Sequence, residues 1–245
     1  MKYIFDVDGT LTPSRGKMDV DFMKFFEKFM KTHDTFLVTG SDQAKTLEQV
    51  GETIYCLAKR VYNCNGNDVY EGLENKHRND WELSKEQIKW LTVKLSESKF
   101  PFRSGNHIEK RPGLTNFSII GRNCTLAERK MYVKWDEDTQ ERSKIAKEFK
   151  EKFPEIEAKV AGETGLDIFP VGMDKSMILK DFDSKEHLVF FGDKMEPEGN
   201  DYEIKSAIEI RNQVNEFSYS CYTVDNYKET WTILKALMEV GIIDG

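Results

Sequence analysis

The sequence predicts an α/β protein in which a mostly parallel sheet is interrupted by a second, inserted domain. Near the start of the chain, apolar runs alternate with segments of helical periodicity, as in YIF (3–5), FMKFFEKFM (22–30) and FLVT (36–39). Strands that alternate with helices form parallel sheets with helices on their faces. HLVFF (187–191) is again typical of a buried strand, so we expect the first domain to resume late in the chain.

The other elements follow from the same reading of apolar periodicity. We expect helices at 43–59, 85–98, after Thr125, at 139–152, near 174–181, at 201–210 and at 226–240. We expect strands at 61–63, 106–110, 115–120, 156–160, 165–169 and 220–224. Ser84 with Gln87, and Thr125 with Glu128, match the capping box that begins a helix. The expected division is 1–82 and 183–245 for the core, and 83–182 for an inserted α+β domain with mostly antiparallel strands.

The composition argues against several classes of protein. The 245 residues are 39% apolar and 32% charged, with a net charge of −7. A mildly acidic chain is a poor general binder of phosphate backbones, so we expect no nucleic-acid partner. No apolar stretch approaches the length of a membrane span, and the four cysteines form no CxxC pair. We therefore expect reduced thiols, no membrane partner and a cytoplasmic location.

Two acids, Asp6 and Asp8, follow the first apolar run in FDVDGTL, with Gly9 and Thr10 directly after them. Side chains two residues apart on a strand share a side, and ligands bind at the strand ends of α/β sheets. Like charges this close repel unless they share a cation or a proton, and Mg²⁺ prefers such oxygen ligands. An acidic turn is the alternative, but the apolar run and the Gly-Thr pair favour a metal and phosphate site.

Two weaker signals concern phosphate binding. TGSD (39–42) follows the second strand, where the Ser41 hydroxyl and backbone N–H groups suit a phosphate. A plain helix cap by Ser41 or Asp42 explains this turn more simply. Lys175 is a lone lysine in DIFPVGMDK, and lysine is ordinarily a solvated surface residue.

The segment FFGDKMEPEGND (190–201) repeats the pattern of the first strand. Its apolar run ends in Asp193, and Asp201 follows after a loop that contains Gly199. Two more carboxylates at a strand end can complete an Mg²⁺ site. The alternative is a loop followed by an acidic helix start, which the helix dipole favours.

The inserted domain carries three guanidinium groups close together in sequence, on Arg111, Arg122 and Arg129. Arginine binds phosphate in a bidentate manner, so this cluster suits a phosphate group. The alternative is ordinary solvated arginines, some of them paired with Glu109, Glu128 or Glu141.

The four pieces occur in the order strand-DxDGT, strand-GS, Lys, strand-GD…ND, and together they resemble the haloacid dehalogenase superfamily. Members of that superfamily transfer phosphoryl groups through an aspartyl-phosphate. FDVDGTLTPSR, GSDQAKTLEQVG, HIEKRPGLTNFSIIGRNCTLAERK, LDIFPVGMDK and FFGDKMEPEGNDYEI resemble eukaryotic-type phosphomannomutases over nearly the whole chain. The resemblance implies a Rossmann-like core, an inserted α+β cap over the active site, and a homodimer formed through the cap.

The resemblance also implies roles for individual residues. Asp6 would be the nucleophile and Asp8 the general acid/base, with Ser41 and Lys175 stabilising phosphate charge. Asp6, the Asp8 backbone and Asp193 would bind Mg²⁺, beside Asp201, and a hexose 1,6-bisphosphate would be the activator. Substrate contacts are implied for Arg15, Arg111, Arg122, Arg129 and Asp167.

The chain departs from the family pattern at a few positions in the cap and the metal loop. Gly165 stands where a serine usually joins Asp167 in contacting sugar hydroxyls. In the family's RNGM loop, the residue after the arginine is here Pro112, and the proline of its SPIGR is Ile119. The tryptophan of its GWDK is Met173, and the first glycine of its GGND is Glu198. These changes bear on the choice of sugar and on mutase competence more than on the core chemistry.

The expected function is the interconversion of mannose 6-phosphate and mannose 1-phosphate through an aspartyl-phosphate and a hexose 1,6-bisphosphate. One alternative is a sugar-phosphate phosphatase of the same superfamily, which would share the nucleophile and the metal site. A catalytically silent sugar-phosphate binder is the other alternative, and it would have lost a catalytic carboxylate.

Overall fold

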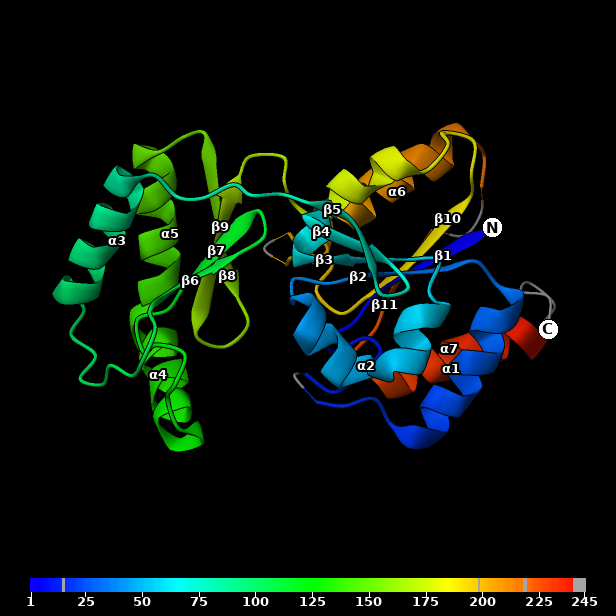
Figure 1. The fold of residues 1–245 in the computed structure, drawn as a ribbon, viewed down its shortest axis with the longest axis horizontal. Helices are drawn as coiled ribbons and strands as arrows, with labels where there is room; N and C mark the ends of the chain where they lie inside the picture. Colours follow the sequence, from blue (N-terminus) through cyan, green and yellow to red (C-terminus); the bar gives the residue numbers. More distant parts are fainter. Residues whose placement is uncertain (15, 198, 218–219, 240–245) are drawn as a thin grey trace. The chain divides into compact units, whose positions relative to one another are not determined.

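The structure, a computed structural model, describes residues 1–14, 16–197, 199–217 and 220–239 and divides into two units (Figure 1). The split unit comprises Met1–Arg78 and Met173–Gly245, and the inserted unit comprises Asn79–Gly172. The boundaries predicted from the sequence lie later, at 82/83 and 182/183. At the second boundary, the difference arises because a short helix after Gly172 belongs to the split unit. At the first boundary, residues 79–82 belong to the inserted unit.

The split unit is built on a seven-stranded sheet with the order β11-β10-β1-β2-β3-β4-β5. Its strands are β1 Lys2–Asp6, β2 Thr35–Val38, β3 Arg60–Asn63, β4 Asp68–Glu71, β5 Glu74–Arg78, β10 Leu188–Gly192 and β11 Cys221–Thr223. The strands from β11 to β3 pair in parallel, which confirms the expected fold class. The chain passes from β1 to β2 on one side, while β10 lies on the other, so the end of β1 is at a switch point where α/β sheets bind ligands.

The antiparallel hairpin of β4 and β5 was not predicted from the sequence. All five residues of β5, ENKHR, are exposed and polar, so no apolar alternation marks this strand. The strand is formed by its backbone pairing with β4. Charged side chains are common on edge strands because they discourage pairing with another strand.

Helices cover both faces of the split unit's sheet (Figure 1). These helices are α1 Val20–Thr32, α2 Gln43–Leu57 and α7 Tyr227–Glu239 on one face, with α6 Tyr202–Val214 and the 3₁₀ helix η2 Lys175–Asp181 on the other. Alternate residues of β1 enter the two cores: Phe5 packs with Phe26 of α1, and Ile4 packs with Ile204 of α6. This is the period-two pattern of a strand buried on both faces.

The inserted unit packs three helices with an antiparallel sheet of order β6-β7-β9-β8. Its elements are α3 Lys85–Glu97, β6 Ile108–Arg111, β7 Leu114–Phe117, α4 Leu126–Thr139, α5 Glu141–Lys152, β8 Ile156–Ala161 and β9 Gly165–Pro170. Both expected capping boxes are confirmed, at Ser84 with Gln87 and at Thr125 with Glu128. Within the described parts of the chain, no helix has the length and apolar character needed to cross a membrane.

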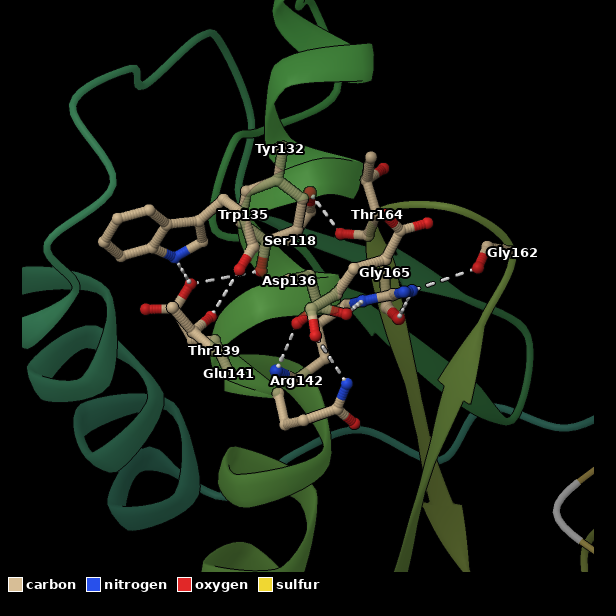
Figure 2. A network of polar contacts seen from close by, with 12 residues as sticks. Ser118, Tyr132, Trp135, Asp136, Thr139, Glu141, Arg142, Gly162, Thr164 and Gly165 are labelled. Atoms are coloured by element: carbon tan, nitrogen blue, oxygen red, sulfur yellow. Dashed lines mark hydrogen bonds and ion pairs between the residues drawn. The ribbon is translucent and has the colours of Figure 1, made fainter.

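A buried polar network fixes the junction of α4 and α5 to the turn between β8 and β9 (Figure 2). The Arg142 Nε lies 2.8 Å from Asp136 Oδ2, and both side chains are about nine-tenths buried. Arg142 Nη1 also donates to the carbonyl oxygens of Gly162, at 3.0 Å, and Gly165, at 3.3 Å. Glu141 accepts from the Tyr132 hydroxyl and the Trp135 indole N–H. The start of β9 is therefore held by an arginine whose charge is paired.

Candidate active site

Three carboxylates gather at the carboxyl ends of β1 and β10. Asp6 ends β1, Asp193 follows β10, and Asp201 immediately precedes α6. Asp6, Asp193 and Asp201 each offer one oxygen atom, and these oxygens lie within 4.8 Å of one another. The structure thus brings together three acids from two distant segments, as the apolar-run-then-acid pattern led us to expect.

Lys175 lies inside this acidic group although nothing in its sequence neighbourhood marks it strongly. Its Nζ lies 2.6 Å from Asp6 Oδ1 and 2.6 Å from Asp201 Oδ1, and the residue is only 1% exposed. Burial alone lowers the pKa of this ammonium group, but the charges of Asp201 and Asp6 outweigh burial and raise the pKa above its usual value. Lys175 therefore stays protonated.

Asp6 is only partly satisfied by Lys175. Its Oδ2 is buried and has no hydrogen-bond partner within the described residues. Burial raises the pKa of Asp6 well above its ordinary value, and the charges of Asp201 and Asp193 raise it further, against the opposing effect of Lys175. Burial likewise raises the pKa of Asp193, against the opposing charge of Lys194, whose exposed Nζ lies 3.4 Å from Asp193 Oδ2. One buried ammonium group thus faces three carboxylates, which leaves negative charge to be offset.

This donor set fits a hard divalent cation. Mg²⁺ takes oxygen ligands and is commonly held by one or two carboxylates together with substrate phosphate. Asp6, Asp193 and Asp201 provide such oxygens, and the unpartnered Oδ2 of Asp6 is an available ligand atom. The Asp8 side chain is not part of this group, so only its backbone could contribute to the same ion.

Asp8 has different surroundings from Asp6. The Ser41 hydroxyl lies 3.3 Å from Asp8 Oδ2, and the amide of Gln49 donates to Asp8 Oδ1 at 2.8 Å. Asp42, rather than Ser41, caps α2 by accepting from the backbone N–H of Lys45. The Ser41 hydroxyl is thereby left to hold Asp8.

Gln49, which is 1% exposed, was not singled out from the sequence. A glutamine on a helix is usually a surface residue, so its type gives no signal. The one local clue is Gly51, which has φ 78° inside α2, because a glycine within a helical pattern often has a packing or functional reason.

Gly9 is required by the close approach of the metal loop. It has φ +86°, and a Cβ built there would lie 2.3 Å from Asp193 Oδ2. A left-handed conformation and so short a distance both favour glycine. The glycine of DVDGT therefore lets the two acidic segments approach each other.

A tight loop after β3 adjoins the Ser41 turn and was also missed in the sequence. Asn65 has φ 59°, an uncommon conformation for a residue other than glycine, and its buried Oδ1 has no partner within the described residues. The N–H of Asn65 donates to Thr39 O at 2.8 Å, and the N–H of Cys64 donates to Ser41 O at 2.9 Å. Strained backbone of this kind is frequent at functional sites.

Two of the predicted arginines converge on one acid of the inserted unit. Arg111 Nη2 lies 2.5 Å from Glu109 Oε2, and Arg122 Nε lies 3.2 Å from the same oxygen. Arg129 pairs instead with Glu163 at 3.2 Å. Of the three acidic partners that the sequence suggested, only Glu109 pairs with any of these arginines in the ion pairs that the structure describes.

Asp167 and Gly165 meet on the same sheet through Asn116. The strand register places Asn116 beside Glu109 on one side and Asp167 on the other, and Asn116 Nδ2 donates to Asp167 Oδ1 at 2.7 Å. A Cβ at Gly165 would lie 2.6 Å from Asn116 Nδ2. The amide of Asn116 therefore occupies the space beside Asp167 that a side chain at position 165 would need.

Two positions of interest, Arg15 and Glu198, lie outside the described residues. The remaining predicted residues fall into two groups, one in each unit. The split unit holds Asp6, Asp8, Ser41, Lys175, Asp193 and Asp201, and the inserted unit holds Arg111, Arg122, Arg129 and Asp167.

The fold and the acidic group together define a protein of the haloacid dehalogenase type. Solved structures with the same fold include a trehalose-6-phosphate phosphatase related protein, with TM-score 0.55 and 15% identity over 98% of this chain and 99% of that chain. The C-terminal domain of the C. albicans trehalose-6-phosphate phosphatase has TM-score 0.65 and 12% identity, over 97% of this chain and 92% of that chain. These likenesses concern the fold alone.

The sequence comparisons identify the family within this fold. The profile of the eukaryotic phosphomannomutase family matches residues 22–238. A phosphomannomutase of Drosophila melanogaster is 34% identical over 97% of this chain and 95% of its own length. One from Saccharomyces cerevisiae is 35% identical over 82% of this chain and 83% of its own length. The chain belongs to the eukaryotic phosphomannomutase family, which confirms the resemblance seen in the sequence.

Proposed function

We propose that this chain interconverts mannose 6-phosphate and mannose 1-phosphate, with a hexose 1,6-bisphosphate as intermediate and activator. The observation that carries the proposal is the group formed by the buried Asp6, Asp201 and Lys175 with the partly buried Asp193, in a chain of this family. Phosphoryl transfer depends mainly on positioning and on offsetting negative charge, and this group combines a carboxylate nucleophile with a fixed cation.

Asp6 is the proposed nucleophile. Lys175 holds its Oδ1, so the carboxylate is fixed in orientation when it attacks phosphorus. The bond from Asp6 to phosphorus forms as the bond from phosphorus to the sugar oxygen breaks, which gives an aspartyl-phosphate. In the proposed cycle, phosphorylated Asp6 gives its phosphoryl group to the free hydroxyl of the sugar monophosphate, which forms the 1,6-bisphosphate. Asp6 then takes the other phosphoryl group of this bisphosphate, which releases the isomeric monophosphate and restores the aspartyl-phosphate.

Asp8 is the proposed general acid and base. It gives a proton to the sugar oxygen when that oxygen leaves, and removes a proton from the sugar hydroxyl that attacks the aspartyl-phosphate. Ser41 and Gln49 hold its two carboxylate oxygens by hydrogen bonds. These bonds orient the carboxylate, and Ser41 is also proposed to contact the phosphate.

Asp6, Asp193, Asp201 and the Asp8 backbone would hold Mg²⁺, which when bound supplies positive charge to offset that of the phosphate. The other phosphate of the bisphosphate is proposed to bind the guanidinium groups of Arg111, Arg122 and Arg129. Arg15 and Asp167 are proposed substrate contacts as well, with Asp167 facing sugar hydroxyls beside Asn116. A homodimer formed through the inserted unit and a cytoplasmic location stay predictions.

Product analysis tests the proposed function directly. The purified protein is given mannose 1-phosphate, Mg²⁺ and a trace of hexose 1,6-bisphosphate, and the products are followed by phosphorus NMR. We expect mannose 6-phosphate as the main product, with Asp6→Asn as the inactive control. Release of free phosphate without mannose 6-phosphate would instead indicate a phosphatase, and a repeat with glucose 1-phosphate measures the preference for the sugar.

A further inference from the structure

A pocket separate from the residues of the acidic group lies in the split unit, between the β3–β5 edge of the sheet and η2. Its volume is about 320 Å³, which is at the lower end of the range for small-molecule sites. None of the residues proposed for catalysis or metal binding lines it. Its lining combines an apolar floor with a charged rim.

The floor is tightly packed. Val69 of β4 and Ile178 of η2 are 5% and 1% exposed, and Met177 lies next to them in the lining. A Cβ at Gly66 would lie 2.8 Å from Ile178 Cγ2, so the loop after β3 packs directly on η2 only because residue 66 is glycine. A floor of this kind suits the apolar part of a small organic molecule.

The rim is formed mainly by basic side chains, two of which are paired with acids. Arg60, Lys76, His77 and Lys180 line the pocket, and Asp181 is the one acid among the lining residues. Asp181 already accepts from Arg60 at 2.9 Å and from the Tyr62 hydroxyl at 3.1 Å.

The ammonium group of Lys180 remains available. Lys76 pairs with Glu74 at 2.7 Å, whereas Lys180 is exposed and has no acidic partner within the parts of the chain that the structure describes. Arg60 is likewise paired, with Glu71 at 2.5 Å and with Asp181 at 2.9 Å. Lys180 is therefore the charge of this rim that can hold an anion.

The floor connects the pocket to the residues proposed for catalysis. Ile178 and Lys180 lie on η2, the short helix that begins at Lys175. Gly66 follows Asn65, whose N–H donates to Thr39 O in the turn that carries Ser41. A molecule in the pocket therefore contacts the two segments that position Lys175 and Ser41.

We propose that this pocket binds a small organic phosphate, and that its occupancy changes the rate of turnover through η2. The phosphate would contact Lys180 and His77, and the organic part would lie on Val69 and Ile178. This site is additional to the one at which the sugar phosphates react.

Calorimetric titration with adenosine monophosphate tests binding. The titration is made in saturating mannose 6-phosphate, so that the reaction site is filled. We expect binding to the wild-type chain and to the charge control Lys228→Glu, about tenfold weaker binding to Lys180→Glu, and near-normal binding to Lys180→Arg. Adenosine, which lacks the phosphate, should bind more weakly than the monophosphate.

The binding site would be overturned if the monophosphate failed to bind in saturating mannose 6-phosphate, or if it bound Lys180→Glu as tightly as the wild-type chain. The regulatory part is tested by measuring kcat with and without the monophosphate at saturating sugar phosphate. We expect kcat to change in the wild-type chain and not in Lys180→Glu, whose basal activity should be normal. An unchanged kcat while the monophosphate is bound would contradict the link through η2.

Discussion

The two units differ in how they bury charge. In the inserted unit, one acid, Asp136, faces one base, Arg142, and the guanidinium also donates to two backbone carbonyls (Figure 2). In the split unit, three carboxylates gather at one site, the buried ammonium group of Lys175 pairs with two of them, and a buried oxygen of Asp6 has no partner within the described residues. Both sites remove charge from water, yet only the first satisfies its charges by itself.

This difference separates a structural network from a reactive one. A buried ion pair is costly to desolvate and persists when its remaining donors and acceptors are satisfied, as Arg142 illustrates with its two carbonyl contacts. A group that keeps surplus charge gains stability only when a cation or substrate arrives. Variants in each unit test this contrast, beginning with the largest expected effect.

Asp6→Asn should abolish turnover while leaving the fold intact. The nucleophile is lost, so we expect the mutase rate to fall by roughly 10⁴-fold or more. Thermal unfolding should change little or shift upward, because one of the repelling carboxylates is removed. The matched control is Asp80→Asn, an exposed acid, which should keep normal activity. Unchanged turnover in Asp6→Asn would exclude Asp6 as nucleophile.

Arg142→Met should lower stability while leaving activity nearly unchanged, the reverse of the effects expected for Asp6→Asn. Removing one partner of a buried ion pair leaves Asp136 uncompensated, so we expect unfolding free energy to fall by about 3 kcal/mol, measured by urea denaturation. Specific activity below the unfolding range should stay close to that of the wild-type chain. The double variant Asp136→Leu/Arg142→Met should recover part of the loss, and a failure to recover would mean that the carbonyl contacts matter more than the charge pair.

Mg²⁺ should stabilise the split unit. Binding to the folded state alone adds about 2.7 kcal/mol at a concentration one hundred times Kd, which a shift of the thermal transition between EDTA and Mg²⁺ measures. Asp193→Asn should lose most of this response, and an equal response would place the ion elsewhere.

The pH dependence of stability should differ with and without the ion. The pKa of Asp6 is raised in the folded state by burial, so the folded chain binds this proton more tightly than the unfolded chain. In EDTA, stability should therefore fall as pH rises from the ordinary pKa of aspartate through the raised one. Mg²⁺ or Asp6→Asn should flatten this decline in thermal unfolding curves, whereas Asp80→Asn should not.

Gln49→Leu should weaken the orientation of Asp8 without removing it. Loss of a group that positions a functional side chain typically costs about 10- to 100-fold in activity. We expect a lower kcat and a displaced pH profile of kcat, with KM nearly unchanged. A rise in KM alone would assign Gln49 to substrate binding instead.

Gly165→Ser should have the smallest effect. The serine would push the Asn116 amide away from Asp167, and one lost hydrogen bond costs about 1 kcal/mol. The kcat/KM ratio between mannose 1-phosphate and glucose 1-phosphate should shift in this variant. An unchanged ratio would show that position 165 does not take part in the choice of sugar.

The sequence by itself determined the parallel sheet, the two capped helices of the inserted unit, and the acids at the ends of β1 and β10. These features are encoded locally, because an apolar run, a capping residue and a following acid lie within a few residues of one another. The motifs that contain them resemble phosphomannomutases closely enough for the amino-acid sequence alone to indicate the family.

Only the tertiary structure decided which side chains meet. Lys175 reaches Asp6 across 169 positions of sequence and Gln49 reaches Asp8 across 41, and neither residue type signals burial. Strand β5 has no apolar pattern in its sequence, and its backbone pairing with β4 holds it in the extended conformation. Long-range contacts depend on how whole elements pack, so local propensity could place the acids at their strand ends but could not show which amide and which ammonium group would hold them.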